Sequence, residues 1–91
     1  MQIEFDADKD ELNQFKHGLP LAFGKRVFGD PFVSLTPTIR IGDEEERWKA
    51  DGYVDGKLYT AVHVWRGDVV RIISVRRSND SERREYDSHT G

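Results

Sequence analysis

Apolar and polar residues alternate along much of the second half of the chain, which is the pattern of half-buried β-strands. The alternation covers three segments, 47–54, 57–66 and 69–77. Asp55-Gly56 separates the first two segments and Gly67-Asp68 the last two, and such dipeptides are typical of two-residue hairpin turns. The pattern therefore predicts a three-stranded antiparallel meander.

The first part of the chain predicts a short strand followed by two helices. The strand is expected at Gln2 to Phe5, where apolar and polar residues alternate. A helix from about Ala7 to His17 follows, because Asp6 can cap its first turn and Gly18 can stop it. A second, short helix is expected to begin at Pro20 and to pass through Phe28.

An edge strand is expected between these helices and the meander. The segment from Phe32 to Ile41 contains Val, Thr and Ile, which favour strands. Pro37 cannot donate a hydrogen bond to a neighbouring strand, so the segment is expected at the edge of the sheet. The acidic segment from Asp43 to Glu46 is then a solvated loop.

After the meander, the sequence predicts a C-terminal helix. Asn79 and Glu82 have the spacing of a capping box, and the helix is expected to end near Ser88. The whole pattern predicts a single α+β domain, residues 1–91. In it, an N-terminal short strand and two helices pack on an antiparallel β-sheet meander, with a helix at the C-terminus.

Two-residue turns would also set the register of the meander, and the register sorts the side chains onto two faces. Arg47 would lie beside Val64, and Val64 beside Arg71. One face, expected under the N-terminal helices, collects Trp48, Ala50, Ala61, His63, Trp65, Val70, Ile72 and Ser74. The other face collects basic residues around an apolar floor: Arg47, Lys49, Arg66, Arg71 and Arg77 around Val62, Val64, Ile73 and Val75.

The composition is that of a folded chain without a metal or cofactor. Apolar residues make up 36% and charged residues 34%, which is a globular rather than a disordered composition. The chain has no cysteine, and its three histidines are far apart in sequence, so neither a disulfide nor a metal site is expected. No apolar run approaches the roughly 20 residues of a membrane span, and the acidic N-terminus is unlike a signal peptide. We therefore expect a cytoplasmic protein without a membrane partner.

The charge is negative overall but unevenly distributed. A net charge of −3 argues against a protein that coats nucleic acid nonspecifically, since such binding needs a strong basic field. The stretch from His63 to Arg77, however, carries four arginines against the single acid Asp68. A local basic site is therefore compatible with the negative total.

Several residues could carry chemistry, and each has a structural alternative. Arginines on an apolar floor suit phosphate, but surface arginines also serve solubility or pair with acids such as Glu46 and Asp51. His17 could transfer a proton, but Lys-His-Gly also suits a helix end. Tyr86 could donate a proton or stack on a base, but an aromatic residue at helical spacing more often packs. Three further residues are interpreted as packed core: His63, Trp48 and Trp65.

Short motifs along nearly the whole chain match those of one known family, in order and with compatible spacing. They are Glu4-x-Asp6, Lys9, Asn13, Lys16-His17-Gly18, Val27-Phe28 with Asp30-Pro31, Glu46-Arg47, Gly52, Arg66-Gly67-Asp68, Arg71-Ile72-Ile73-Ser74 followed by Arg76-Arg77, and Glu82-Arg83 with Tyr86. With these residues the chain resembles the BrnT family of bacterial toxins. The resemblance implies a RelE-like α+β fold, RNA cleavage that stops translation, and neutralisation by a BrnA-type antitoxin encoded beside the toxin.

The resemblance also implies a partner arrangement. It implies a tight complex of two toxins and two antitoxins, in which only the antitoxin contacts operator DNA. A basic face is a natural target for an acidic segment of the antitoxin, which would block RNA by occupying the same arginines. Inhibition by occlusion is therefore expected.

The expected reaction is metal-free attack of a ribose 2′-hydroxyl on the adjacent phosphate of the RNA substrate. Arg71 and Arg47 are the candidates for stabilising charge in the transition state, with Arg77 further along the same face. His17 and Tyr86 are the candidates for proton transfer. The RNA-binding candidates are Lys16, Lys49, Arg66, Arg76 and Arg83. Two other functions stay open: a noncatalytic module that binds the antitoxin and assists repression, and an RNA-binding domain that does not cleave.

Overall fold

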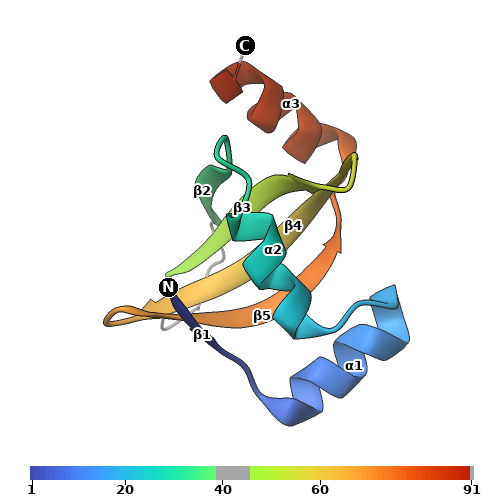
Figure 1. Ribbon diagram of the computed structural model, residues 1–91, viewed down its shortest axis with the longest axis vertical. Coiled ribbons are helices and arrows are strands. Elements are labelled where there is room, and N and C mark those ends of the chain that lie inside the picture. Colours follow the sequence, from blue (N-terminus) through green and yellow to red (C-terminus); the bar gives the residue numbers. More distant parts are fainter. Residues whose placement is uncertain (39–45, 91) are drawn as a thin grey trace.

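The computed structural model describes residues 1–38 and 46–90, and it has the predicted α+β architecture (Figure 1). The elements, in order, are β1 (Gln2–Glu4), α1 (Ala7–His17), the 3₁₀ turn η1 (Leu21–Phe23), α2 (Gly24–Phe28), β2 (Ser34–Thr38), β3 (Arg47–Val54), β4 (Lys57–Arg66), β5 (Val69–Arg77) and α3 (Asp80–Thr90). The strands form one sheet in the order β1-β5-β4-β3-β2. The predicted meander is confirmed, and its three strands have the predicted bounds.

The two outer strands complete the sheet on either side of the meander. β2 pairs antiparallel with β3 at one edge, where Pro37 lies opposite Trp48. This confirms the predicted edge strand, although residues 39–41 of the prediction lie outside the described residues, as do residues 43–45 of the predicted loop. At the other edge β1 runs parallel to β5, with Glu4 opposite Arg71. That parallel pairing joins the N-terminus to a strand more than sixty residues away.

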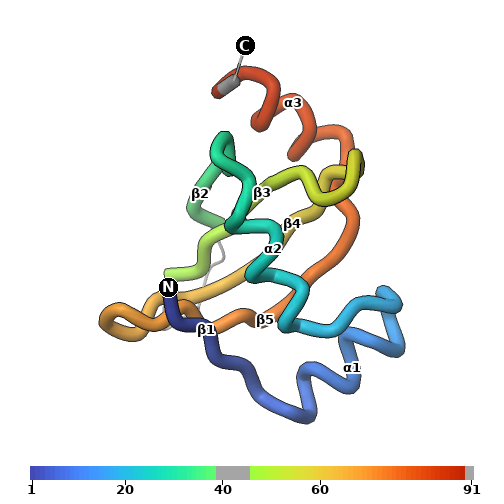
Figure 2. The backbone as a smooth tube through the Cα atoms, viewed as in Figure 1, coloured from blue at the N-terminus to red at the C-terminus, as the bar shows by residue number. Residues whose placement is uncertain are grey.

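The three helices surround the sheet in different ways (Figures 1 and 2). In the view of Figure 1, α2 crosses the front of the sheet, α3 lies at the top and α1 lies at the bottom. The core lies between the sheet and the segment that contains η1 and α2. Its buried apolar residues are Leu21, Val27, Ala50, Val54, Ala61, Val70, Ile72 and Val75. At Gly52 a Cβ atom would lie 2.4 Å from the carbonyl oxygen of Val27, so only glycine permits this approach of α2 to β3.

The predicted helix caps are confirmed. The side chain of Asp6 accepts hydrogen bonds from the backbone N–H groups of Asp8 and Lys9, and Gly18 ends α1 with a φ of 69°. At α3 the Asn79 N–H donates to the Glu82 carboxylate, and the Glu82 N–H donates to the Asn79 side chain, at 2.8 and 2.9 Å. α3 continues to Thr90, two residues beyond the predicted end.

α1 is attached to the sheet by polar side chains. The Asn13 side chain donates to the carbonyl oxygen of Val75 at 2.9 Å and accepts from its N–H at 3.1 Å. Asn13 thus satisfies the edge of β5 beyond the point where β1 ends, much as another strand would. Asp10 accepts a further hydrogen bond, 2.7 Å long, from the N–H of Leu21. The inner side of α1 is therefore polar.

The predicted sorting of side chains on β5 is wrong beyond residue 73, because the strand contains a β-bulge. His63 pairs with Ile72, but Val62 pairs with Ser74, so the register shifts by one residue. One extra residue moves every later side chain to the opposite face. Val75 therefore lies in the core rather than on the basic face, and Arg76 replaces Arg77 beside the other basic residues.

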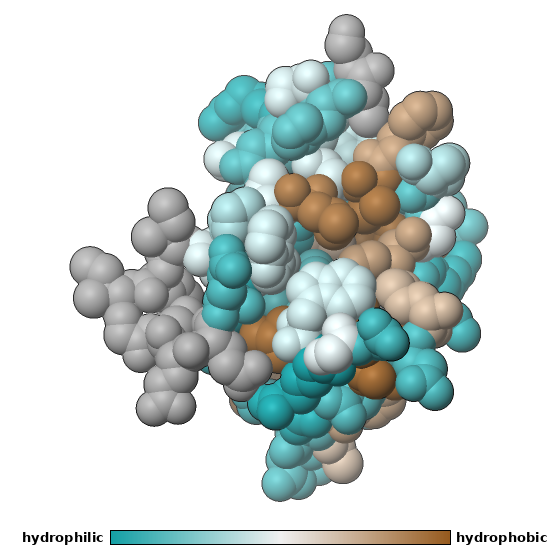
Figure 3. All heavy atoms as spheres, turned by 90° about the vertical axis from the view of Figure 1, so that its left-hand side faces the viewer, coloured by the Kyte–Doolittle hydropathy of each residue, from teal (hydrophilic) through white to brown (hydrophobic). Residues whose placement is uncertain are grey.

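The aromatic residues predicted to be core divide into two groups. His63 is fully buried and packs edge-on against Phe28, with ring centroids 4.9 Å apart. Trp48 is half-buried, whereas Trp65 is 44% exposed, so the prediction that Trp65 lies in the core is wrong. Apolar atoms gather on the side of the molecule that carries β2 (Figure 3). Apolar side chains of the sheet, such as Trp65 and Leu35, are therefore partly exposed to solvent.

Candidate nucleic-acid interface

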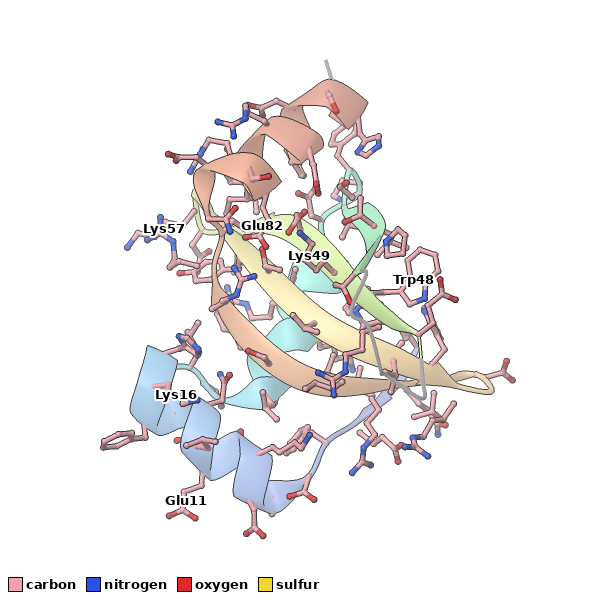
Figure 4. All side chains as sticks on the ribbon, turned by 180° about the vertical axis from the view of Figure 1, so that it is seen from behind. Glu11, Lys16, Trp48, Lys49, Lys57 and Glu82 are labelled. Atoms are coloured by element: carbon pink, nitrogen blue, oxygen red, sulfur yellow. The ribbon has the colours of Figure 1, made fainter. Side chains whose placement is uncertain are left out.

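The face of the sheet opposite α2 carries basic side chains from adjacent strands. Figure 4 views the molecule from the side opposite to Figure 1, so that this face is toward the viewer, with α3 above it and α1 below it. Lys49 pairs with Val62, and Arg71 with Val64, and residues paired directly across strands project on the same side. Arg76, paired with Thr60, belongs to the same side. We call this surface the basic face; its members from the sheet are Arg47, Lys49, Arg71 and Arg76, around the half-buried Val62 and the buried Val64.

A buried carboxylate organises the upper part of the basic face. Glu82 of α3 is 1% exposed and accepts two hydrogen bonds from the guanidinium group of Arg76, each 2.7 Å long. The Nζ atom of Lys49 lies 3.5 Å from the same carboxylate, and Figure 4 shows these two residues side by side. In the sequence, Glu82 stands out as a helix-capping residue and as part of the Glu82-Arg83 motif. Its spacing to Asn79 predicted that cap but not the ion pair.

The environment of Glu82 keeps it ionised. Burial by itself would raise the pKa of the carboxyl group, but the hydrogen bonds from Arg76 and from the Asn79 N–H outweigh burial and lower the pKa to about 2. The hydrogen bonds between Arg76 and Glu82 in turn raise the pKa of Arg76 above its ordinary value. Both groups are charged at neutral pH, so this ion pair fixes the direction of the Arg76 side chain.

A second buried acid lies next to this ion pair; the sequence suggested it only as a possible partner for surface arginines, not as a buried group. Asp51 of β3 is fully buried and accepts a 2.6 Å hydrogen bond from the Thr60 hydroxyl. Its Oδ2 atom has no hydrogen-bond partner among the described residues. Burial raises the pKa of Asp51 to about 6, and the nearby charge of Glu82 adds to this rise. The available signal was an aspartate inside a central strand, where this residue type is depleted.

Arg71 lies where β1 joins α1. Its guanidinium Nη1 atom is 3.4 Å from Glu4 Oε1, and its Nη2 atom is 4.0 Å from Asp6 Oδ2. The parallel pairing of β1 with β5 sets Glu4 directly beside Arg71. The two carboxylates hold the Arg71 side chain in place. Because the side chain is still 31% exposed, part of it faces solvent. Arg47 was predicted to pair with Val64 on the side away from Arg71. The β3–β4 ladder ends one residue pair earlier, at Trp48–His63, so Arg47 and Val64 lie just beyond it.

α1 borders the basic face with a small pocket. This pocket has a volume of about 210 Å³ and is lined by Lys9, Leu12, Asn13, Lys16, His17, Ile73 and Ser74. Lys16 lies on the side of α1 that faces β5 (Figure 4). The β-bulge contributes Ile73 and Ser74, so the irregularity in β5 shapes one wall of the pocket. The sequence-predicted pair Lys16 and His17 is thus brought next to the sheet.

Tyr86 lies away from the basic face, in the contact between α3 and the loop after α2. Its hydroxyl donates a 2.6 Å hydrogen bond to Asp30 Oδ2, and its ring packs edge-on against Tyr53. Only 6% of the residue is exposed. Burial and the Asp30 hydrogen bond raise the pKa of Tyr86 to about 12. The phenol is therefore bound to a carboxylate within the protein.

The other basic candidates are distributed around the molecule. Arg77 pairs with Tyr59 on the side of the sheet that faces η1, and its guanidinium carbon lies 5.5 Å from the Tyr59 ring centroid. Arg83 is exposed and donates a 3.0 Å hydrogen bond to the Tyr53 hydroxyl. Arg66 pairs with Val69 on the same side of β4 as Val64, as predicted, but it lies exposed at the end of the strand, at the margin of the basic face. The structure thus separates Arg77 from Arg71, whereas the sequence pattern had grouped them.

The described residues lack two further kinds of feature. They contain no group of three or more His, Cys, Asp or Glu residues placed to hold a metal ion. In the same part of the chain, no helix has the length and apolar character needed to cross a membrane.

His63, the buried histidine, bonds through Nδ1 to the carbonyl oxygen of Ala61, and burial lowers its pKa. Its role is packing in the core, as predicted.

Comparison with known proteins gives one family. A family model described as "Ribonuclease toxin, BrnT, of type II toxin-antitoxin system" matches residues 5–82. This match spans α1, the sheet from β2 to β5 and the start of α3. A search of curated proteins gave no match. The chain therefore belongs to the BrnT family of ribonuclease toxins of type II toxin-antitoxin systems.

Proposed function

We propose that this toxin cleaves RNA on the basic face, with Lys16 and His17 of α1 at its border. The observation that carries the proposal is the pairing Val64–Arg71 and Val62–Lys49, which sets cationic groups around an apolar floor. Cations over apolar surface attract phosphate more strongly than cations in bulk water. Family membership supplies the substrate class, and the basic face is the surface on which we place it.

The proposed reaction needs no metal ion. The ribose 2′-oxygen attacks the adjacent phosphorus, the bond from phosphorus to the 5′-oxygen breaks, and a cyclic phosphate and a free 5′-hydroxyl result. A base takes the 2′-proton and an acid protonates the leaving 5′-oxygen. We assign Arg71, with Arg47, to the negative charge that develops on the phosphate oxygens. His17 is our candidate for proton transfer, and Lys16, Lys49 and Arg76 for holding neighbouring phosphates.

The carboxylates beside these cations have a positioning role in this proposal. Glu4 and Asp6 hold Arg71, and Glu82 holds Arg76, so the guanidinium groups are oriented before RNA arrives. Preoriented charge costs little reorganisation during the reaction. Tyr86 is assigned a structural role instead of proton transfer, because its hydroxyl is bound to Asp30.

The test compares Arg71→Ala with the matched control Arg77→Ala, which removes the same charge from the opposite face. Purified proteins are incubated with messenger RNA, with and without EDTA, and each variant is checked for folding by circular dichroism. We expect Arg71→Ala to lower the cleavage rate about 100-fold or more, and Arg77→Ala and EDTA to have little effect. Equal loss in both variants would refute the assignment to the basic face. Loss with EDTA would refute the metal-free route, and bound but intact RNA would indicate a non-cleaving RNA-binding domain.

We further propose that the antitoxin partner is of the BrnA type and that two toxins and two antitoxins form the complex. The type II family implies an antitoxin protein. Co-expression of the adjacent reading frame should restore growth, and light scattering of the purified complex should give the mass of two copies of each chain. A mass that corresponds to one copy of each would refute the stoichiometry while leaving the antitoxin in place.

A further inference from the structure

The outward side of α1 is more apolar than its inward side, which is the reverse of an ordinary surface helix. The residues that face the protein are Asn13, which is 5% exposed, and Asp10, and both act through hydrogen bonds. Leu12 and Phe15 face outward and are 51% and 89% exposed. Folding therefore gains little from the two largest apolar side chains of this helix.

These two residues belong to a continuous stripe. Asp8, Glu11, Leu12 and Phe15 follow the spacing that places residues on one side of a helix. The same four residues line a shallow hollow of about 410 Å³. Figure 4 shows Glu11 directed away from the sheet, so the stripe and the basic face lie on different sides of α1. We call these four residues the α1 stripe.

We propose that the α1 stripe is a docking site for a helical segment of the antitoxin that carries apolar side chains flanked by lysine or arginine. An exposed aromatic residue beside an aliphatic one suits an amphipathic helix, because such helices bind through side chains at spacings of three and four. Within the part of the chain that the structure describes, the hollow is lined by two carboxylates and no cation, so its charge complements a basic partner segment. An acidic segment would be repelled here.

The position of the stripe links docking to inhibition. Leu12 lines both this hollow and the pocket that contains Lys16 and His17. A helix seated on the stripe would therefore lie at the border of the basic face and restrict the approach of RNA. This inference rests on the antitoxin partner that the family implies, and it does not depend on RNA cleavage.

The experiment measures binding of the purified antitoxin, encoded beside this chain, to toxin variants by calorimetry. Phe15→Ser removes an apolar side chain that is 89% exposed, and Glu11→Lys reverses one charge of the hollow. The matched control is Phe32→Ser, since Phe32 is also a strongly exposed phenylalanine, 63%, but lies outside α1. All three side chains are exposed, so thermal unfolding is expected to change little and will confirm that each variant folds.

We expect Phe15→Ser and Glu11→Lys each to weaken antitoxin binding about tenfold or more, and Phe32→Ser to change it less than twofold. The effect of Glu11→Lys should shrink at high salt, because its cause is a charge. Unchanged binding in both α1 variants would overturn the proposal. So would a toxin that dimerises by itself through this surface, seen by light scattering as a dimer that Phe15→Ser converts to a monomer. A toxin that binds its antitoxin normally but fails to cleave RNA would contradict the proposed function and leave this inference intact.

Discussion

Arg76 of β5 and Glu82 of α3 form a bidentate ion pair, with two hydrogen bonds of 2.7 Å, in a place where Glu82 is almost completely buried. The pair joins the end of the sheet to the first turn of α3 and directs Arg76 along the basic face. Because Lys49 lies 3.5 Å from the same carboxylate, one acid controls two of the cations that we assign to RNA binding. Stability and function are therefore coupled at Glu82.

Glu82→Gln is expected to destabilise the protein by about 3 kcal/mol, because it leaves Arg76 partly buried without its counter-charge. Urea unfolding at pH 7 measures the loss. Glu85→Gln on the same helix is the control and should change the free energy of unfolding by less than about 0.5 kcal/mol. A loss for Glu82→Gln no larger than that of the control would contradict a structural role for the ion pair.

Asp51 predicts an unusual dependence of stability on pH. Its pKa is about 6 in the folded protein and near 3.8 when unfolded, so the folded state binds the proton more tightly. Its contribution to stability is present in full below pH 3.8 and is lost as pH rises through 6. The difference corresponds to at most about 3 kcal/mol. In Asp51→Asn this dependence between pH 4 and 7 should disappear, which urea unfolding across that range will measure.

The stability contributed by Glu82 changes with pH in the opposite direction to that of Asp51, so the two acids can be distinguished by experiment. Its folded pKa of about 2 lies below the ordinary value of 4.5, so its stabilisation is present above pH 4.5 and is lost as pH falls toward 2. Between pH 4 and 7 the change in the free energy of unfolding is therefore assigned to Asp51. If this free energy changes equally with pH in Asp51→Asn and in the parent protein, the raised pKa of Asp51 is incorrect.

Asn13→Leu is expected to cost about 2 to 4 kcal/mol. The substitution keeps the approximate size of the side chain but leaves the N–H and C=O groups of Val75 without their partner. Gln14→Leu, one residue away on the exposed side, should change stability by less than about 0.5 kcal/mol. Thermal unfolding of both variants distinguishes a specific loss of sheet-edge hydrogen bonds from a general effect on α1.

Tyr86→Phe tests whether the phenol is structural. It removes a 2.6 Å hydrogen bond to Asp30 and should lower stability by about 1.5 to 3 kcal/mol, because the acceptor is charged. RNA cleavage per folded molecule should be unchanged. Tyr53→Phe removes a hydroxyl that accepts a hydrogen bond from the exposed Arg83, and it should have a smaller effect on stability. A large loss of cleavage rate in stable Tyr86→Phe would return Tyr86 to the catalytic candidates.

His17→Gln tests the border of the basic face. If His17 transfers a proton, the substitution should lower the turnover rate by about 100-fold, with little change in the amount of RNA bound. Lys9→Gln is the control, because Lys9 lines the same pocket without an assigned proton-transfer role. If His17→Gln and Lys9→Gln both change the turnover rate only slightly, His17 does not transfer a proton and its role is confined to RNA binding.

Much of the fold was predictable because its signals are local. Asp55-Gly56 and Gly67-Asp68 set the two hairpins, and the strands they join have the predicted bounds. The caps at Asp6 and Asn79 are equally local, since each cap hydrogen bond joins residues two or three apart. The basic face could be anticipated in part, because alternation along β3 and the first half of β5 places Lys49 and Arg71 on one side.

The sequence by itself therefore determined the elements, their order and the hairpin pairing, whereas only the tertiary structure decided which residues of β5 share a face. The bulge at Ile73 and Ser74 exchanges Arg77 for Arg76, and the strand just beyond it is hydrogen-bonded to Asn13, about sixty positions earlier in the sequence. Likewise, Asp51 and Glu82 look like surface acids until α3 folds over the sheet and buries both. Turn and cap chemistry is encoded within a few neighbouring residues, but burial, and the pKa shifts that follow from it, arise from long-range packing.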